Sequence, residues 1–177
     1  NAVGFSTDYL GFVTITPPLN RAEAEWLTGF ADWGGLPDGD PFRLPMNPRA
    51  AIAQAFMDRG GSMVPPAGIP HGVHDWRVCE HGDRIMWRRF EKSNDAEQAL
   101  TFLVDHYLGP DAKAKDSDNP DFADFTFDHR LDVVIAGERD DTDELFLLRV
   151  TNSEFSQETL VPGVAWWAIP GALDLLS

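Results

Sequence analysis

The chain has 177 residues and a formal net charge of −15, and 43% of its residues are hydrophobic. This length and composition are typical of one globular domain with a substantial core. The acidic balance disfavours nucleic acid and anionic membranes as partners, because a negatively charged protein gains no affinity from phosphate or anionic lipid. It leaves neutral or cationic partners, and we expect a basic protein partner.

We expect one domain over residues 3–177, and we interpret Asn1 and Ala2 as the remnant of a cleaved expression tag. No apolar run approaches the roughly 18 residues of a membrane span, and no basic stretch followed by an apolar one suggests a signal peptide. Cys79 is the single cysteine. It excludes an intrachain disulfide and favours a reducing, cytoplasmic location.

The first predicted elements are a strand over residues 9–15 and a helix that begins after Asn20. Aromatic and β-branched residues alternate in the strand, and Pro17 and Pro18 end it because proline donates no ladder hydrogen bond. Asn20 with Glu23 resembles a capping box, and apolar residues then recur on one helical face. These apolar residues are Trp26, Leu27, Phe30 and Ala31.

Residues 34–72 are rich in glycine and proline, and they predict a long loop with one extra short helix inside it. Asn47 suits the N-cap of this helix, Pro48 suits its first turn, and Gly60 suits the left-handed closing position. Long loops inside compact domains often serve as lids or binding segments.

Two short strands over residues 74–79 and 84–90 follow, and the polar turn between them predicts a hairpin. Asn94 with Glu97 then predicts the capped start of a second main helix, which ends before Gly109. Its apolar face carries Ala96, Ala99, Leu100, Leu103 and Tyr107.

The strongest strand pattern in the chain is a hairpin between Phe125 and Val150. Two β-rich runs flank a polar turn that contains Gly137, and each run carries apolar residues on both of its faces. Strands of this kind are usually buried on both sides, so we expect the hairpin at the centre of the sheet. The acidic stretch 111–124 before it predicts an exposed loop, and residues 158–161 predict an edge strand.

The order of these elements lacks the strict alternation of parallel α/β folds and predicts a single α+β domain. We expect a mostly antiparallel sheet with the two main helices on one face, and a split β-α-β arrangement fits this order. The apolar tail 164–176 either packs back onto the sheet or covers a neighbouring subunit in a homo-oligomer. Its large side chains are Trp166, Trp167, Ile169, Leu173, Leu175 and Leu176.

The first candidates for a metal site or a nucleophile are His71, His74, Cys79 and His81. The spacing of Cys79 and His81 suits two zinc ligands, but no second pair of similar spacing is visible, so we expect no metal. A Cys79 nucleophile would need His106 or His129 brought beside it by the fold. The common glycine-rich and hydrolase motifs are absent, so we assign no catalytic residue and no cofactor.

The best candidate ligand site is the hairpin region from Arg77 to Lys92, where arginines lie among aromatic residues. Arginine beside aromatic rings stacks on planar ligands or binds carboxylates and phosphates. The structural alternative is a half-buried hairpin whose arginines balance the acidic loops. The predicted ligand-binding residues are Trp76, Arg77, Trp87, Arg89 and Glu91.

Several short motifs follow one another in a familiar order. Gly11-Phe12 and Thr16-Pro17-Pro18-Leu19 lead into the first helix, and Trp87 with Glu91-Lys92 precedes a later one. In this order they resemble a group of small uncharacterised bacterial and phage proteins, which have W-D-G-x-E-K-F-Y before that helix. This chain lacks the Asp-Gly and the following aromatic residues of that motif. The resemblance implies a topology and carries over no catalytic residue.

We therefore expect a non-enzymatic protein-binding or accessory module, immunity-like or phage-related, whose partner is a basic protein. The alternative is a small-ligand-binding protein or enzyme with a pocket between the 34–72 loop and the 74–90 hairpin. A third hypothesis is a DNA mimic that presents carboxylates at the spacing of phosphates.

Overall fold

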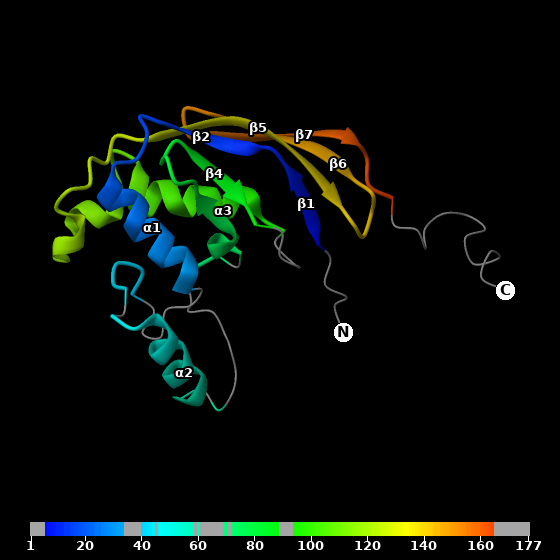
Figure 1. Ribbon diagram of the computed structural model, residues 1–177. Helices are drawn as coiled ribbons and strands as arrows, with labels where there is room; N and C mark the ends of the chain where they lie inside the picture. The colour runs from blue at the N-terminus through cyan, green and yellow to red at the C-terminus, as the bar shows by residue number, and fades with distance from the viewer. Residues whose placement is uncertain are drawn as a thin grey trace.

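The computed structural model describes residues 6–33, 40–44, 46–58, 60, 69–70, 72–88 and 94–164. A seven-stranded sheet arches over the helices, with the strand order β3-β4-β2-β5-β6-β7 and β1 paired with β5 (Figure 1). All of the strand pairs in this part of the chain are antiparallel. The strands are β1 (Thr7–Leu10), β2 (Phe12–Thr16), β3 (Trp76–Val78), β4 (Arg84–Trp87), β5 (Arg130–Arg139), β6 (Leu145–Thr151) and β7 (Glu154–Val161).

The strand order contains two interlocked split β-α-β units. In the first, β2 leads through helix α1 (Arg21–Trp33) to β3, and β4 lies between these two strands. In the second, β4 leads through helix α3 (Ala96–Leu103) to β5, and β2 lies between them. This is the βαββαβ arrangement called ferredoxin-like, to which the chain adds β6 and β7 at one edge. The predicted α+β fold with a split β-α-β arrangement is confirmed.

Both main helices cover the same face of the sheet. Figure 1 shows α1 and α3 beneath the arch of strands, with helix α2 (Pro48–Asp58) beyond α1 and farther from the sheet. The ring centroids of Phe30 on α1 and Phe102 on α3 lie 6.3 Å apart, so the two helices share one core. The prediction of two main helices on one face is confirmed.

Helix α1 starts with a reciprocal capping box, as predicted. Asn20 Oδ1 accepts a hydrogen bond from Glu23 N at 3.0 Å, and Glu23 Oε2 accepts one from Asn20 N at 2.8 Å. These bonds satisfy backbone donors that have no partner inside the helix. The predicted apolar face is confirmed as well, because Trp26, Leu27, Phe30 and Ala31 are all buried.

Helix α3 has a different N-cap from the predicted one. Asp95 is the capping residue, and its carboxylate accepts a hydrogen bond from Gln98 N at 3.0 Å. The predicted pair was Asn94 with Glu97, one position earlier, but Asn94 Oδ1 instead accepts a hydrogen bond from Thr7 Oγ1 of β1. Asn and Asp are both good capping residues. Because Asn94 bonds to Thr7, Asp95 caps the helix instead.

Helix α2 begins after Asn47, whose Oδ1 accepts a hydrogen bond from Ala50 N at 3.1 Å. Gly60 follows its end with a φ of +63°, a left-handed conformation that glycine adopts without strain. Phe56 and Met57 on this helix are 42% and 73% exposed. These two side chains therefore contribute little to the core.

The predicted strand 9–15 is interrupted at Gly11, where φ is +119°. Residues before the interruption form β1 and pair with 136–139 of β5, whereas those after it form β2 and pair with 130–132. Side-chain-bearing residues rarely adopt this φ, so glycine permits the kink. The prediction of one continuous strand was wrong.

The core lies between the sheet and the two main helices. On β5, Leu131 and Ile135 are fully buried, whereas Val134 between them in sequence is 49% exposed. On β6, Phe146 and Leu148 are likewise buried. The hairpin occupies the centre of the sheet, as predicted, but the expected burial on both faces was wrong. In the part of the chain that the structure describes, no helix covers the outer face (Figure 1).

The acidic stretch 111–124 is anchored rather than freely exposed. Ala112, Ala114 and Phe122 are buried, and the Phe122 ring centroid lies 4.9 Å from that of Trp26. The exposed-loop prediction therefore holds for the acidic side chains but not for Ala112, Ala114 and Phe122. The short 3₁₀ and π turns of the molecule are Val73–Asp75, Val104–Leu108, Lys113–Asp116 and Pro120–Phe122.

Strand β7 forms an edge of the sheet, longer than the predicted strand over residues 158–161. The apolar tail beyond Val164 lies outside the described residues. Within the described ranges, no helix is both long enough and apolar enough to cross a membrane.

Candidate functional site

The two tryptophans of the predicted hairpin site lie beside the core. Trp76 on β3 and Trp87 on β4 are opposite each other in register. Both rings pack against Tyr9, with centroid distances of 5.6 and 5.2 Å. Trp76 is 3% exposed, and Trp87 is half-buried. In this arrangement the two rings stabilise the packing of β1 against the hairpin.

Arg77 connects the same hairpin to helix α1. Its guanidinium Nη1 forms an ion pair with the carboxylate of Asp32, and its side chain is 20% exposed. Its Nε is buried without a hydrogen-bond partner among the described residues. Arg89 and Glu91 lie outside those residues, so ligand binding by the predicted group of five stays a prediction.

Cys79 contacts a carboxylate. Its thiol donates a hydrogen bond to Asp83 Oδ1 at 3.0 Å, and this bond lowers the pKa of Asp83. His106 Nδ1 lies 3.0 Å from Phe102 O, and His129 belongs to a separate buried network. The two histidines that were candidate bases therefore form their contacts elsewhere.

The histidines near Cys79 are also dispersed. His74 Nδ1 lies 3.1 Å from Phe30 O, and burial lowers the pKa of His74 to about 4. His81 is exposed on the hairpin turn, and His71 lies outside the described residues. Among the residues that the structure places, no group of three or more His, Cys, Asp or Glu side chains is arranged to hold a metal ion.

A shallow groove of ≈ 300 Å³ lies between helix α1 and the β3–β4 hairpin. It is close to the place where a small-ligand pocket was predicted, but it involves neither predicted tryptophan. Its lining residues are Ala24, Glu25, Thr28, Val78, Cys79 and Glu80.

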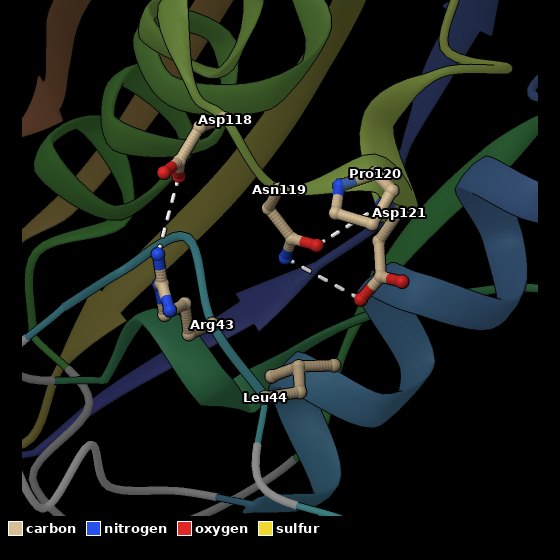
Figure 2. Close-up of a pocket in the computed structure, with 6 residues that line it drawn as sticks. All are labelled: Arg43, Leu44, Asp118, Asn119, Pro120 and Asp121. Atoms are coloured by element: carbon tan, nitrogen blue, oxygen red, sulfur yellow. Dashed lines mark hydrogen bonds and ion pairs between the residues drawn. The ribbon is translucent and has the colours of Figure 1, made fainter.

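A second hollow, of ≈ 240 Å³, separates the loop 40–44 from the turn at 118–121 (Figure 2). Arg43 Nη2 lies 3.2 Å from Asp118 Oδ1 across it. Asn119 Nδ2 donates to Phe42 O at 2.7 Å. Because these polar groups bond to one another, they hold the loop to the turn. We interpret the hollow as the surface between the loop and the turn that these bonds join.

The most completely bonded polar cluster is centred on Glu23 and His129, which are 1% and 2% exposed. His129 Nε2 lies 3.0 Å from Glu23 Oε1, and His129 Nδ1 lies 2.7 Å from Pro17 O. Thr126 N donates to Glu23 Oε1 at 2.7 Å, while Glu23 Oε2 accepts the capping bond from Asn20 N. The cluster therefore ties α1, the segment after β2 and the start of β5 together.

The protonation of this cluster follows from its partners. A carbonyl and a carboxylate only accept, so the contacts with Pro17 O and Glu23 favour the cationic imidazole, in which both nitrogens donate. Burial alone would lower the pKa of His129, but the bonds to Glu23 and Pro17 outweigh it and raise the pKa above its ordinary value. Burial alone would raise the pKa of Glu23, but the bonds from His129, Thr126 and Asn20 outweigh it and lower the pKa. Both shifts favour the charged forms, so the contacts favour a buried ion pair.

The outer face of the sheet carries a continuous apolar surface. Phe12 lies opposite Met86, and Leu10 lies opposite Ala136, which in turn lies opposite Leu147. Exposed fractions reach 41% for Phe12 and 61% for Leu10. Contiguous exposed apolar surface usually marks an interaction site. We call the surface formed by Leu10, Phe12, Met86, Val134 and Leu147 the open face.

One end of the open face, the acidic end, carries carboxylates. Asp8 on β1 and Glu138 on β5 lie directly opposite each other, a like-charge pair that a cation would relieve. With Asp140, Asp143 and Ser6 they line a hollow of ≈ 310 Å³. None of the four carboxylates forms an ion pair with a basic side chain in the described ranges.

Comparison of the chain with models of known protein families, with characterised proteins and with solved structures found no match in any of the three. The resemblance to small bacterial and phage proteins therefore stays a prediction.

Sequence reasoning missed both the buried ion pair and the open face. Glu23 was recognised only as a capping residue, and His129 only as a distant candidate base. The available signal for the open face was the apolar residue Val134 on the second face of β5. That signal was taken to indicate a strand buried on both faces.

Proposed function

We propose that this protein is a non-enzymatic binding module that docks a basic protein partner on the open face. The observation that carries this proposal is the row of exposed apolar side chains across β1, β2, β4 and β5, which borders the Asp8–Glu138 pair. Apolar contact supplies affinity, and carboxylates beside it favour a partner with lysine or arginine at the matching place.

The charges of the outer face support a cationic partner. Arg149 lies 3.5 Å from Glu158, and Arg84 lies 4.6 Å above the Phe12 ring. These local cations are already engaged, whereas Asp8 and Glu138 have no described basic partner. The net charge of −15 adds a long-range attraction for basic proteins.

The setting that we propose is an accessory role, immunity-like or phage-related, in the cytoplasm. The single cysteine, half-buried and free, supports a reducing compartment. The alternative, a small-ligand site at the 74–90 hairpin, has less support because Trp76 is buried against Tyr9 and Arg77 is paired with Asp32.

Peptide-display selection on the immobilised full chain tests the proposal, with random peptides as the probe. We expect enriched peptides to combine lysine or arginine with aliphatic or aromatic residues, and their affinity to fall as salt rises. Val134→Arg should weaken their binding about tenfold or more, equivalent to about 1.4 kcal/mol, because it places a cation inside the contact.

Ala53→Arg is the matched control for this test. It adds the same charge on an exposed position of α2, away from the sheet (Figure 1), and should leave peptide binding unchanged. The proposal fails if no peptides are enriched, if their binding is insensitive to salt, or if the two arginine variants bind them equally.

A further inference from the structure

Strand β7 is an edge of the sheet, and its backbone pairs along one side. Its eight residues run antiparallel to β6, and among the residues that the structure describes no other strand pairs with it. Seven of the eight residues are exposed, and Phe155 is half-buried. We call the side of β7 that faces away from β6 the free edge.

The turn before β7 determines which backbone groups face the free edge. Asn152 and Ser153 form a two-residue turn with φ values of +50° and +63°, and such a turn closes on a hydrogen-bonded pair, here Thr151 and Glu154. Bonded and non-bonded pairs then alternate along the ladder, so every second residue of β7 directs its N–H and C=O away from β6. These residues are Phe155, Gln157 and Thr159.

The common devices that prevent strand addition are missing from most of β7. Edge strands of soluble proteins are usually protected by proline, by lysine or by a bulge. The sequence of β7 contains neither proline nor lysine. Its one irregularity in register lies at the far end, opposite Leu145 and Phe146. Residues 154–159 therefore present a regular row of backbone groups on which another strand can pair.

The charges of β7 favour a basic strand. Glu158 lies opposite Leu147 on the outer face, and Glu154 shares that face because side chains alternate along a strand. Glu154 forms no ion pair in the described ranges. The ion pair of Glu158 with Arg149 is exposed and therefore weak. Lysine or arginine directly across from the two glutamates would stabilise an added strand.

We propose that the free edge of β7 binds an extended segment of a partner protein as an added antiparallel strand, in which lysine or arginine alternates with β-branched or aromatic residues. Backbone bonds to β7 supply affinity, and the glutamates supply the preference for a basic segment. Antiparallel pairing is the more stable kind. A second copy fits less well, because its own β7 adds two more glutamates and its charge is also −15. The site goes beyond docking on the open face and stands on separate observations.

Calorimetric titration of the full chain with a synthetic peptide of alternating lysine and valine, as long as β7, tests the proposal. With the lysines across from the glutamates, the valines lie opposite Phe155, Gln157 and Thr159 and exchange backbone bonds with them. Methylation of the valine amide nitrogens removes these donors and should raise the Kd about tenfold or more. Methylation of the lysine amide nitrogens, which point away from β7, should change it by about twofold at most. The two methylated peptides have the same composition and charge, so each is the control for the other.

A variant of the protein tests the same edge from the other side. Gln157→Pro removes an N–H that faces the free edge and no bond of the β6–β7 ladder, a position at which edge strands tolerate proline. It should weaken the unmethylated peptide about tenfold, whereas Gln157→Ala keeps the N–H and should bind normally. Circular dichroism checks that both variants fold. If Gln157→Pro does not fold, the two methylated peptides decide the question on the natural chain.

Equal binding of the two methylated peptides would overturn the edge site, because attraction by charge alone does not depend on which amide is methylated. No binding of the unmethylated peptide, or normal binding to a folded Gln157→Pro, would also overturn it. So would dimers that form with rising concentration and disappear in Gln157→Pro, because they assign the edge to a second copy. Val134→Arg separates this site from the proposed function. It should leave the peptide on β7 unaffected, and a loss of binding in Val134→Arg alone would place the peptide on the open face.

Discussion

The two faces of the sheet differ in burial and in the pairing of their charged side chains. On the helix-covered face, side chains such as Ile135 are fully buried. The buried side chains of Glu23 and His129 there contact each other and also bond to backbone groups. On the outer face, Val134 is 49% exposed, and the like charges Asp8 and Glu138 stand opposite each other. The covered face is buried and stabilises the fold, whereas the outer face leaves apolar side chains and like charges exposed.

This difference separates residues that hold the fold from residues that are free to bind a partner. A buried charge must be fully paired, because leaving water costs several kcal/mol per ion. An exposed carboxylate pays no such cost and remains available to a ligand. Neighbouring residues of one strand, such as Val134 and Ile135, therefore serve different purposes.

We expect the largest loss of stability when one partner of the buried Glu23–His129 pair is removed. His129→Ala leaves the Glu23 carboxylate buried without its cation and opens the bonds to Pro17 O, so we expect a loss of about 3–5 kcal/mol in the free energy of unfolding. Urea denaturation measures it. Arg21→Ala is the control on the same helix, because the Arg21–Glu25 pair is exposed and its loss should not be measurable. Equal losses in the two variants would contradict this account.

The comparison between the faces is tested most directly on β5. Ile135→Ala removes a fully buried side chain and should cost about 3 kcal/mol, because it leaves a cavity under the sheet. Val134→Ala, one residue away and on the outer face, should change stability by about 0.5 kcal/mol. Urea titrations of both variants provide the measurement. A loss at Val134 as large as that at Ile135 would mean that the outer face belongs to the core.

Local patterns made much of the fold predictable from sequence. The Asn20–Glu23 capping box spans only three residues, so its chemistry is visible in the sequence, and the structure has both of its bonds. The hairpin of β5 and β6 follows from two β-rich runs around one turn. The kink at Gly11 was missed because glycine inside a strand pattern fits a continuous strand as well as an interruption.

The functional surfaces depend on contacts between distant parts of the chain. Glu23 meets His129 only because α1 and the start of β5 lie side by side in the fold, which no local spacing encodes. The apolar residues on both faces of β5 indicate a central strand, but they do not say whether a second layer is present. Val134 is therefore compatible with a buried sandwich and with an exposed docking face until the topology is known.

The pH dependence of stability gives the smallest and most specific test of the covered face. His129 has a raised pKa in the fold, so its stabilisation is complete below about pH 6.5 and is lost as the pH rises through the folded pKa. The lowered pKa of Glu23 acts oppositely: its stabilisation is complete above about pH 4.3 and is lost as the pH falls through the folded pKa. We therefore expect the stability difference between the natural chain and His129→Gln to be largest between about pH 4.3 and 6.5 and to narrow above that range.

His74 has the opposite effect on the pH dependence of stability. The test therefore compares two chains that both contain His74. Burial lowers its pKa to about 4, so its neutral form stabilises the fold above about pH 6.5, and this contribution is lost as the pH falls. Both chains keep His74, and its contribution cancels in the difference between their urea midpoints. A difference that stays constant from pH 6 to pH 9 would show that His129 is not charged in the fold. The Glu23–His129 contact would then be a neutral hydrogen bond, and the large loss expected for His129→Ala would have to come from packing alone.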